Sequence, residues 1–112
     1  MTNAKIIAVF EPHTYSRTKA LLDEFAQSFY WADELIILPT YAARESKDKG
    51  IDGSELASYI NKNGEGALYI DNYDDACEFI ESSCASRDTV VILGAGSVNI
   101  LGDMLTKKKA DK

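Results

Sequence analysis

A histidine and an arginine stand four residues apart, directly after the first apolar run of the chain. His13 and Arg17 follow the run at 6–10, and Pro12 ends that run. His13 offers a titratable imidazole, and the guanidinium of Arg17 is a fixed fork of donors that suits a carboxylate or a phosphate. Arg17 should lie in the first turn of a helix. A cation there interacts unfavourably with the positive end of the helix dipole unless an anion binds nearby. We therefore predict that His13, Arg17 and the helix start form an anion site.

A second candidate loop follows the last apolar run. Gly94, Gly96 and Ser97 belong to the segment Gly94-Ala95-Gly96-Ser97, which precedes apolar residues at helical spacing. Two glycines permit a tight turn and a close approach of the backbone to a ligand, and N–H groups at a helix start can hold an anion. The segment resembles a dinucleotide fingerprint, but Asn99 replaces the third glycine and the loop follows the last strand. NAD and FAD are therefore disfavoured.

Other chemistries find less support. Ser16-x-x-Lys19 matches a serine acyl-enzyme pattern by letter alone, and without a second base motif we expect Ser16 to cap a helix. The chain has no Gly-Lys-Ser or Gly-Lys-Thr loop, so it is not by itself a P-loop nucleotide hydrolase. Cys77 and Cys84 should lie two helical turns apart, about 10 Å, which is too far for a disulfide. With His13 as the single histidine, we predict reduced, buried thiols and no metal site.

Composition limits the class of protein. The 112 residues carry a net charge of -6 at pH 7, so binding to nucleic acid by neutralising phosphates is not expected. No apolar run approaches the roughly 20 residues that span a membrane. The N-terminus lacks the pattern of a signal peptide. We expect one soluble, cytoplasmic domain that binds neither nucleic acid nor membrane.

Four apolar runs alternate with helical patterns, and these elements must position the candidate residues. Strands are predicted at 6–10, 35–38, 67–70 and 89–93, and helices at 16–31, from a cap at Ser54, at 73–83, and from a cap at Ser97. This alternation predicts a three-layer, Rossmann-like α/β fold with a mainly parallel sheet of about four strands and helices on both faces. A strand order of 3-2-1-4 would bring the loops at 11–17 and 94–97 together at the carboxyl edge.

The loop at 40–53 is long and polar for so small a domain, and it contains Tyr41-Ala42-Ala43-Arg44-Glu45. Loops of this length inside compact domains are disproportionately functional, although surface variability is the alternative.

Three motifs in order give the chain a family resemblance. They are Val9-Phe10-Glu11-Pro12-His13-Thr14-Tyr15-Ser16-Arg17-Thr18, Tyr41-Ala42-Ala43-Arg44-Glu45 and Gly94-Ala95-Gly96-Ser97. Together they resemble the C-terminal domain of the Mur ligases, in particular of the members that act on UDP-N-acetylmuramate and L-alanine. The first motif departs from the family's pattern with Glu11 in place of Gln and with Thr14 where some members have Arg. The related murein-peptide ligase ranks second, and a stand-alone, non-catalytic α/β anion-binding module is the competing class.

The resemblance implies a reaction and its partners. In such ligases ATP phosphorylates the muramyl carboxylate, the amine of L-alanine attacks the acyl phosphate, and Mg²⁺ neutralises the phosphates. Residues 1–112 would be the amino-acid-binding domain, excised from a chain whose UDP-sugar and central ATPase domains are missing here. We therefore expect this fragment alone to be inactive, to bind neither ATP nor Mg²⁺, and to contain no catalytic or metal-binding residue.

The same resemblance assigns site residues. Arg17 would pair with the carboxylate of L-alanine, and His13 would line the same pocket. Tyr15 and Arg44 are further candidate substrate-binding residues, and the loop at 94–97 would approach an anion through its backbone.

Overall fold

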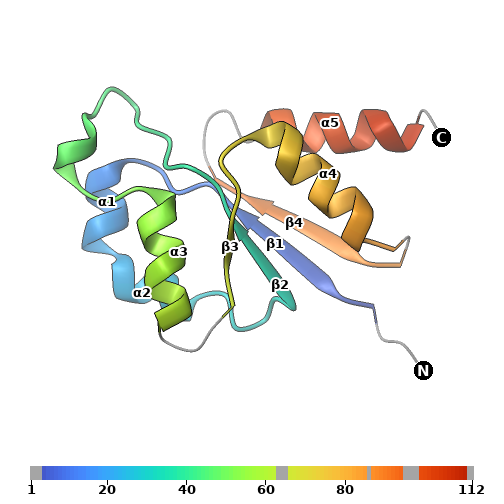
Figure 1. The fold of residues 1–112 in the computed structure, drawn as a ribbon, viewed down its shortest axis with the longest axis horizontal. Coiled ribbons are helices and arrows are strands. Elements are labelled where there is room, and N and C mark those ends of the chain that lie inside the picture. Colours follow the sequence, from blue (N-terminus) through green and yellow to red (C-terminus); the bar gives the residue numbers. More distant parts are fainter. Residues whose placement is uncertain (1–3, 63–65, 86, 95–98, 111–112) are drawn as a thin grey trace.

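Four short strands form one parallel sheet. The computed structural model describes residues 4–62, 66–85, 87–94 and 99–110, without the side chains of 107–110. The strands are β1 (Ile6–Phe10), β2 (Glu34–Ile37), β3 (Leu68–Tyr69) and β4 (Thr89–Leu93). They pair in parallel in the order β3-β2-β1-β4 (Figure 1). The predicted fold class and strand order are confirmed.

Helices cover both faces of this sheet. They are α1 (Tyr15–Ala20), α2 (Leu22–Gln27), α3 (Gly53–Lys62), α4 (Tyr73–Ser83) and α5 (Asn99–Ala110), with a 3-10 turn at Lys47–Lys49. Figure 1 shows α1, α2 and α3 grouped together, and α4 beside α5. Ile7 and Val9 of β1 join one buried cluster with residues of α4 and α5, whereas Ala8 joins a second cluster with residues of α3. Alternate side chains of β1 thus face opposite layers.

The strand register brings the candidate loops to one edge. Phe10 lies opposite both Ile37 and Leu93, and the Glu11 N–H donates to the Leu93 carbonyl at 2.9 Å. The segments that follow β1 and β4 therefore start side by side at the carboxyl edge, as predicted. Gly94 lies there, whereas Gly96, Ser97 and the predicted cap at Ser97 fall outside the described residues.

The predicted single helix at 16–31 is wrong. Two helices form instead, separated at Leu21 (φ -108°), and the second ends at Gln27. The Thr18 hydroxyl donates to the Thr14 carbonyl at 2.7 Å, and such a bond to the preceding turn bends helices. The Ser28 N–H donates to a carbonyl three residues back at 3.2 Å, which tightens the last turn and ends the helix.

Both boundaries of the second and third strands differ from prediction. The second strand begins and ends one residue early, at Glu34 and Ile37. Its start is earlier because Glu34 pairs with Ile7 and its carboxylate lies 3.2 Å from the Lys5 ammonium. The third strand is one residue shorter than predicted at each end. Its start is later because the Asn61 side chain binds both backbone groups of Ala67. Its amide accepts from the Ala67 N–H at 2.7 Å and donates to the Ala67 carbonyl at 3.0 Å.

The helix α4 has the predicted bounds, and Asn72 caps it by accepting from the Asp75 N–H at 2.7 Å. Both cysteines are free thiols, as predicted. Cys77 is buried, but Cys84 is only half-buried, because it follows the last residue of α4. The prediction that both thiols are buried is therefore wrong for Cys84.

Asp52, and not the predicted Ser54, caps α3. One carboxylate oxygen of Asp52 accepts from the Ser54 N–H at 3.3 Å, and the Glu55 carboxylate accepts from the Asp52 N–H at 3.3 Å. This reciprocal pair is a capping box. The other oxygen of Asp52 accepts from the Thr40 N–H at 2.9 Å, so one buried carboxylate joins the loop after β2 to the start of α3. Burial and this carboxylate raise the pKa of Tyr69, whose hydroxyl donates to Asp52, to about 12.

We expect Asp52→Asn to destabilise the chain by about 1 to 3 kcal/mol at pH 7, because an amide cannot accept all the hydrogen bonds that the carboxylate accepts. Burial raises the pKa of Asp52, but hydrogen bonds from the backbones of Thr40, Ser54 and Gly53 outweigh it and leave the pKa below its usual value. A depressed pKa stabilises the fold above the unfolded value of about 3.9, and this stability is lost as the pH falls through the folded pKa.

Urea unfolding at pH 7 and at about pH 3 would measure this linkage. The difference between the wild type and Asp52→Asn should shrink at the lower pH. Asp103→Asn, at an exposed position on α5, is the matched control and should change little at either pH. A difference for Asp52→Asn that does not depend on pH would contradict the pKa argument.

Candidate functional site

Two loops are joined where β1 ends. His13 and Tyr41 form a parallel bridge, in which the Thr14 N–H donates to the Tyr41 carbonyl and the Tyr41 N–H donates to the Pro12 carbonyl, each at 2.8 Å. The rings of His13 and Tyr41 stack, with centroids 5.5 Å apart and planes inclined by 19°. The loop after β2 therefore orients the His13 imidazole.

The start of α1 is capped by Thr14 and not by Ser16, so that prediction is wrong. Thr14 has φ 65°, and its hydroxyl accepts from the Arg17 N–H at 3.3 Å. Ser16 donates from its N–H to one oxygen of the Glu45 carboxylate at 3.0 Å and from its hydroxyl to the other. The side-chain and backbone hydrogen bonds of Ser16 hold the pKa of Glu45 below its usual value, so Glu45 is the anion at this helix start.

The predicted anion site must be corrected accordingly. Because the N–H groups of Ser16 and Arg17 already bind Glu45 and Thr14, the helix start does not offer them to a ligand. The Arg17 side chain is exposed, and it makes no hydrogen bond or ion pair to the described residues. An anion that binds at the start of α1 would therefore bind the Arg17 guanidinium instead of the backbone N–H groups of Ser16 and Arg17.

His13 and Arg17 share an open depression beside α1. Its volume is about 590 Å³, and it is lined by His13, Thr14, Ser16, Arg17, Ala20 and Leu21. Tyr15 and Arg44 do not line this depression, although both lie close to it along the chain. The Tyr15 carbonyl instead accepts from the Ile51 N–H at 3.2 Å. Of the four predicted substrate-binding residues, the structure thus brings His13 and Arg17 into one depression.

Arg44 lies in a turn of unusual backbone conformation. Ala43 has φ 49° and Arg44 has φ 80°, and the Glu45 N–H donates to the Ala42 carbonyl at 2.9 Å. Positive φ at both central positions is typical of a type I′ turn, which favours Gly and Asn. Alanine and arginine adopt it here at an energetic cost, so contacts at the two ends of the turn must hold it.

Two other motif residues have defined roles at the same edge. Gly94 has φ 155°, a conformation that glycine adopts far more readily than other residues. Glu11, which departs from the family's Gln, is 4% exposed. Its carboxylate accepts from the Tyr73 hydroxyl at 2.6 Å, so it joins the end of β1 to the start of α4.

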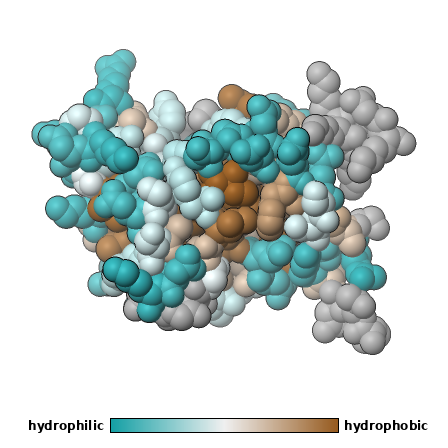
Figure 2. All heavy atoms as spheres, in the orientation of Figure 1, coloured by the Kyte–Doolittle hydropathy of each residue, from teal (hydrophilic) through white to brown (hydrophobic). Residues whose placement is uncertain are grey.

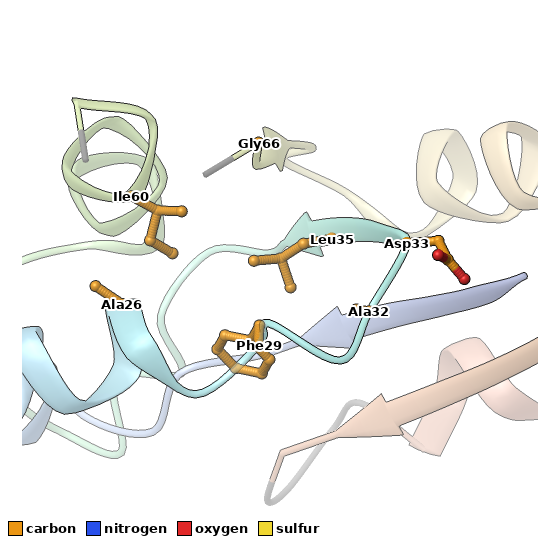
Figure 3. Close-up of a pocket in the computed structure, with 7 residues that line it drawn as sticks. All are labelled: Ala26, Phe29, Ala32, Asp33, Leu35, Ile60 and Gly66. Carbon is orange, nitrogen blue, oxygen red and sulfur yellow. The ribbon is translucent and has the colours of Figure 1, made fainter. Parts of the chain in front are cut away.

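One further cavity and the exposed apolar surface are lined by no cation among the described residues. A more enclosed cavity of about 160 Å³ lies at the opposite edge of the sheet (Figure 3), where Phe29, Leu35 and Ile60 turn apolar side chains into it. Asp33 at its rim accepts from the Ile6 N–H at 2.7 Å. Figure 2 shows hydrophobic atoms gathered near the middle of one face, and Leu68 is 42% exposed. Neither surface is suited to an anion.

Within residues 4–62, 66–85, 87–94 and 99–110, no group of three or more His, Cys, Asp or Glu side chains could hold a metal ion. No helix there is long and apolar enough to cross a membrane.

Sequence reasoning missed Glu45 and Tyr41 as organising residues. Both belong to a motif that the sequence displays, but their contacts with Ser16 and His13 cross 29 and 28 positions of the chain. The signal that could have indicated a role for both residues was their motif, because it lies in a loop longer than a simple connection between two elements needs.

Comparison with known proteins places the chain in a family. A model described as "Mur ligase, glutamate ligase domain" matches residues 1–96. The chain is 48% identical over 100 residues to the UDP-N-acetylmuramate–L-alanine ligase of Caldanaerobacter subterraneus subsp. tengcongensis, covering 88% of this chain and 22% of that protein. It is 42% identical over 105 residues to the enzyme of the same name from Clostridium acetobutylicum, covering 93% of this chain and 23% of that protein.

A solved structure has the same fold. The UDP-N-acetylmuramate–alanine ligase of Thermotoga maritima superposes with a TM-score of 0.72 at 20% identity, covering 98% of this chain and 21% of that one. The chain thus spans about a fifth of the length of these relatives. Because the family model matches most of its residues, the chain belongs to the Mur ligase family, in which it corresponds to the glutamate ligase domain.

Proposed function

We propose that residues 1–112 are the amino-acid-binding domain of a ligase that joins L-alanine to UDP-N-acetylmuramate in peptidoglycan synthesis. The observation that carries this proposal is the placement of His13 and Arg17 in one depression at the carboxyl edge, within a chain 48% identical to a UDP-N-acetylmuramate–L-alanine ligase. That relative also favours L-alanine ligation over the activity of the murein-peptide ligase.

The reaction has two steps. A carboxylate oxygen of UDP-N-acetylmuramate bonds to the terminal phosphorus of ATP as ADP leaves. The neutral amine of L-alanine then attacks the acyl carbon, phosphate leaves, and the nitrogen loses a proton. An amide bond results.

This chain contributes the residues that bind the amino acid. The guanidinium of Arg17 is exposed and makes no ion pair within the described residues, so its planar fork is free to bind the carboxylate of L-alanine in a bidentate manner. His13, fixed by its stack on Tyr41, forms another wall of the same depression. Holding L-alanine by its carboxylate leaves the amine free to attack, and closure against the rest of the ligase would exclude water from the acyl phosphate.

ATP and Mg²⁺ do not fit the residues of this chain alone. The sequence has no Gly-Lys-Ser or Gly-Lys-Thr loop, and the described part offers no cluster of metal ligands. We assign both to the parts of the ligase outside this chain and derive no step through Mg²⁺. We place the reaction in the cytoplasm because it consumes ATP and because the two free thiols suit a reducing compartment.

The isolated chain should fold but not catalyse. Phosphate release from ATP, in the presence of UDP-N-acetylmuramate and L-alanine, should stay at background with the purified 112-residue chain. A longer polypeptide that restores the ATP-binding part should show release that depends on both substrates. Turnover by the isolated chain comparable with that of an intact ligase would contradict the assignment of ATP binding to other domains.

A further inference from the structure

Glu45 fastens two arginine-bearing segments to each other. Both of its carboxylate oxygens accept hydrogen bonds from Ser16, one from the N–H at 3.0 Å and one from the hydroxyl. Ser16 directly precedes Arg17, and Arg44 directly precedes Glu45. One carboxylate therefore brings the backbones that carry two guanidinium groups to neighbouring positions.

The turn that carries Arg44 depends on this attachment. Positive φ at Ala43 and Arg44 is unfavourable for residues with a Cβ, so the local sequence does not select this turn. Its first end is held by the Tyr41 bridge to the His13 segment. Its other end is held by Glu45 on Ser16.

We propose that Glu45 is a positioning residue for the carboxylate of the amino-acid substrate, acting through Ser16 to fix the Arg17 guanidinium over the depression and Arg44 beside it. The proposal rests on the function proposed above and extends it. Without the two hydrogen bonds, the start of α1 and the Ala42–Glu45 turn lose one of the contacts that join them, and the Tyr41 bridge and the Ile51–Tyr15 hydrogen bond remain. The backbone that carries Arg17 is then less fixed, and the substrate carboxylate must order it on binding.

A neighbouring carboxylate offers a matched comparison. Asp48 lies on the same loop, is exposed like the side chains around it, and accepts a hydrogen bond from Ser46 only two residues away. It therefore resembles Glu45 in charge and location but does not join the loop to α1. A kinetic effect that is specific to Glu45 points to its contacts with the start of α1, of which the hydrogen bonds from Ser16 are the largest.

The test is steady-state kinetics on the full-length ligase that carries this domain. Glu45→Ala should raise KM for L-alanine about 10- to 100-fold, since a small misplacement of a positioning group costs up to this much. KM for ATP and kcat should change by less than about 2-fold, because the lost interaction concerns ground-state binding of one substrate. Asp48→Ala should leave all three constants unchanged.

A double variant checks the route of the effect. If Glu45 acts through Ser16, the Ser16→Ala/Glu45→Ala pair should match Glu45→Ala alone, because the second change removes nothing further. Additive effects, or an unaltered L-alanine constant in Glu45→Ala, would overturn the proposal. So would equal losses for L-alanine and ATP.

Glu45→Gln covers the case in which the alanine variant does not fold. The amide keeps the size of the side chain and one acceptor for the Ser16 N–H, so KM for L-alanine should rise less than in the alanine variant, by about 3-fold. No rise would overturn the proposal. If Arg17→Ala weakens L-alanine binding but the Glu45 variants do not, the positioning role fails while the proposed function stands. If the rate of the wild-type ligase does not depend on the L-alanine concentration, the proposed function itself is wrong.

Discussion

Replacing Arg17 with alanine in the full-length ligase should raise KM for L-alanine about 10- to 150-fold and leave KM for ATP almost unchanged. The expected loss is that of a charge-assisted hydrogen-bonded pair with a carboxylate, about 1.5 to 3 kcal/mol. Stability should hardly change, because the Arg17 side chain is exposed and unpaired among the described residues. Steady-state kinetics with each substrate varied in turn gives the two constants.

Two further variants sharpen this test. Arg17→Lys should recover only part of the affinity, because a point charge does not reproduce bidentate geometry. Lys19→Ala removes a charge from an exposed position on the same helix and should leave KM for L-alanine unaltered. An unaltered constant in Arg17→Ala would remove Arg17 from the site, and an equal effect of Lys19→Ala would mean that only net charge matters.

Gly50→Ala should destabilise the chain by about 3 kcal/mol, the upper part of the range for overpacking. A Cβ at Gly50 would lie 1.8 Å from the Tyr15 carbonyl oxygen, which is backbone and cannot swing aside. The loop after β2 lies directly against the first residue of α1 at this place, and the Ile51 N–H bonds the same carbonyl. Relief of the clash must therefore separate the loop from α1.

Gly66→Ala is the matched control, since a Cβ there meets nothing within 4 Å. It should be neutral or slightly stabilising, because alanine restricts the unfolded chain. Urea unfolding of the 112-residue chain would compare the two. Equal stability of Gly50→Ala and Gly66→Ala would show that the loop does not pack on α1 as described.

The layers of the fold could be predicted because they follow from local patterns. The bounds of β1, β4 and α4 agree with the sequence, since apolar runs and helical spacing are visible residue by residue. Once strands and helices alternate, a parallel sheet follows from general rules of connection. Its order was predicted by choosing the Rossmann-like arrangement among those that such a sheet can adopt.

The details of the site could not be predicted, because they depend on distant partners. Ser16 is an ordinary cap by type, yet Thr14 takes that role while Glu45, 29 positions away, binds Ser16. Nothing in Ala43 or Arg44 indicates positive φ, since a type I′ turn favours Gly and Asn. Tertiary contacts override the local preferences at these positions.

The most direct test of the central claim is the incorporation of isotope-labelled L-alanine by the full-length ligase that carries this domain. With UDP-N-acetylmuramate and ATP, the wild type should form a labelled product in step with phosphate release, and Arg17→Ala should require a far higher L-alanine concentration for the same rate. Two results would contradict the assignment of this domain to amino-acid binding. One is phosphate release without incorporation of L-alanine, and the other is an Arg17→Ala variant that needs the same L-alanine concentration as the wild type.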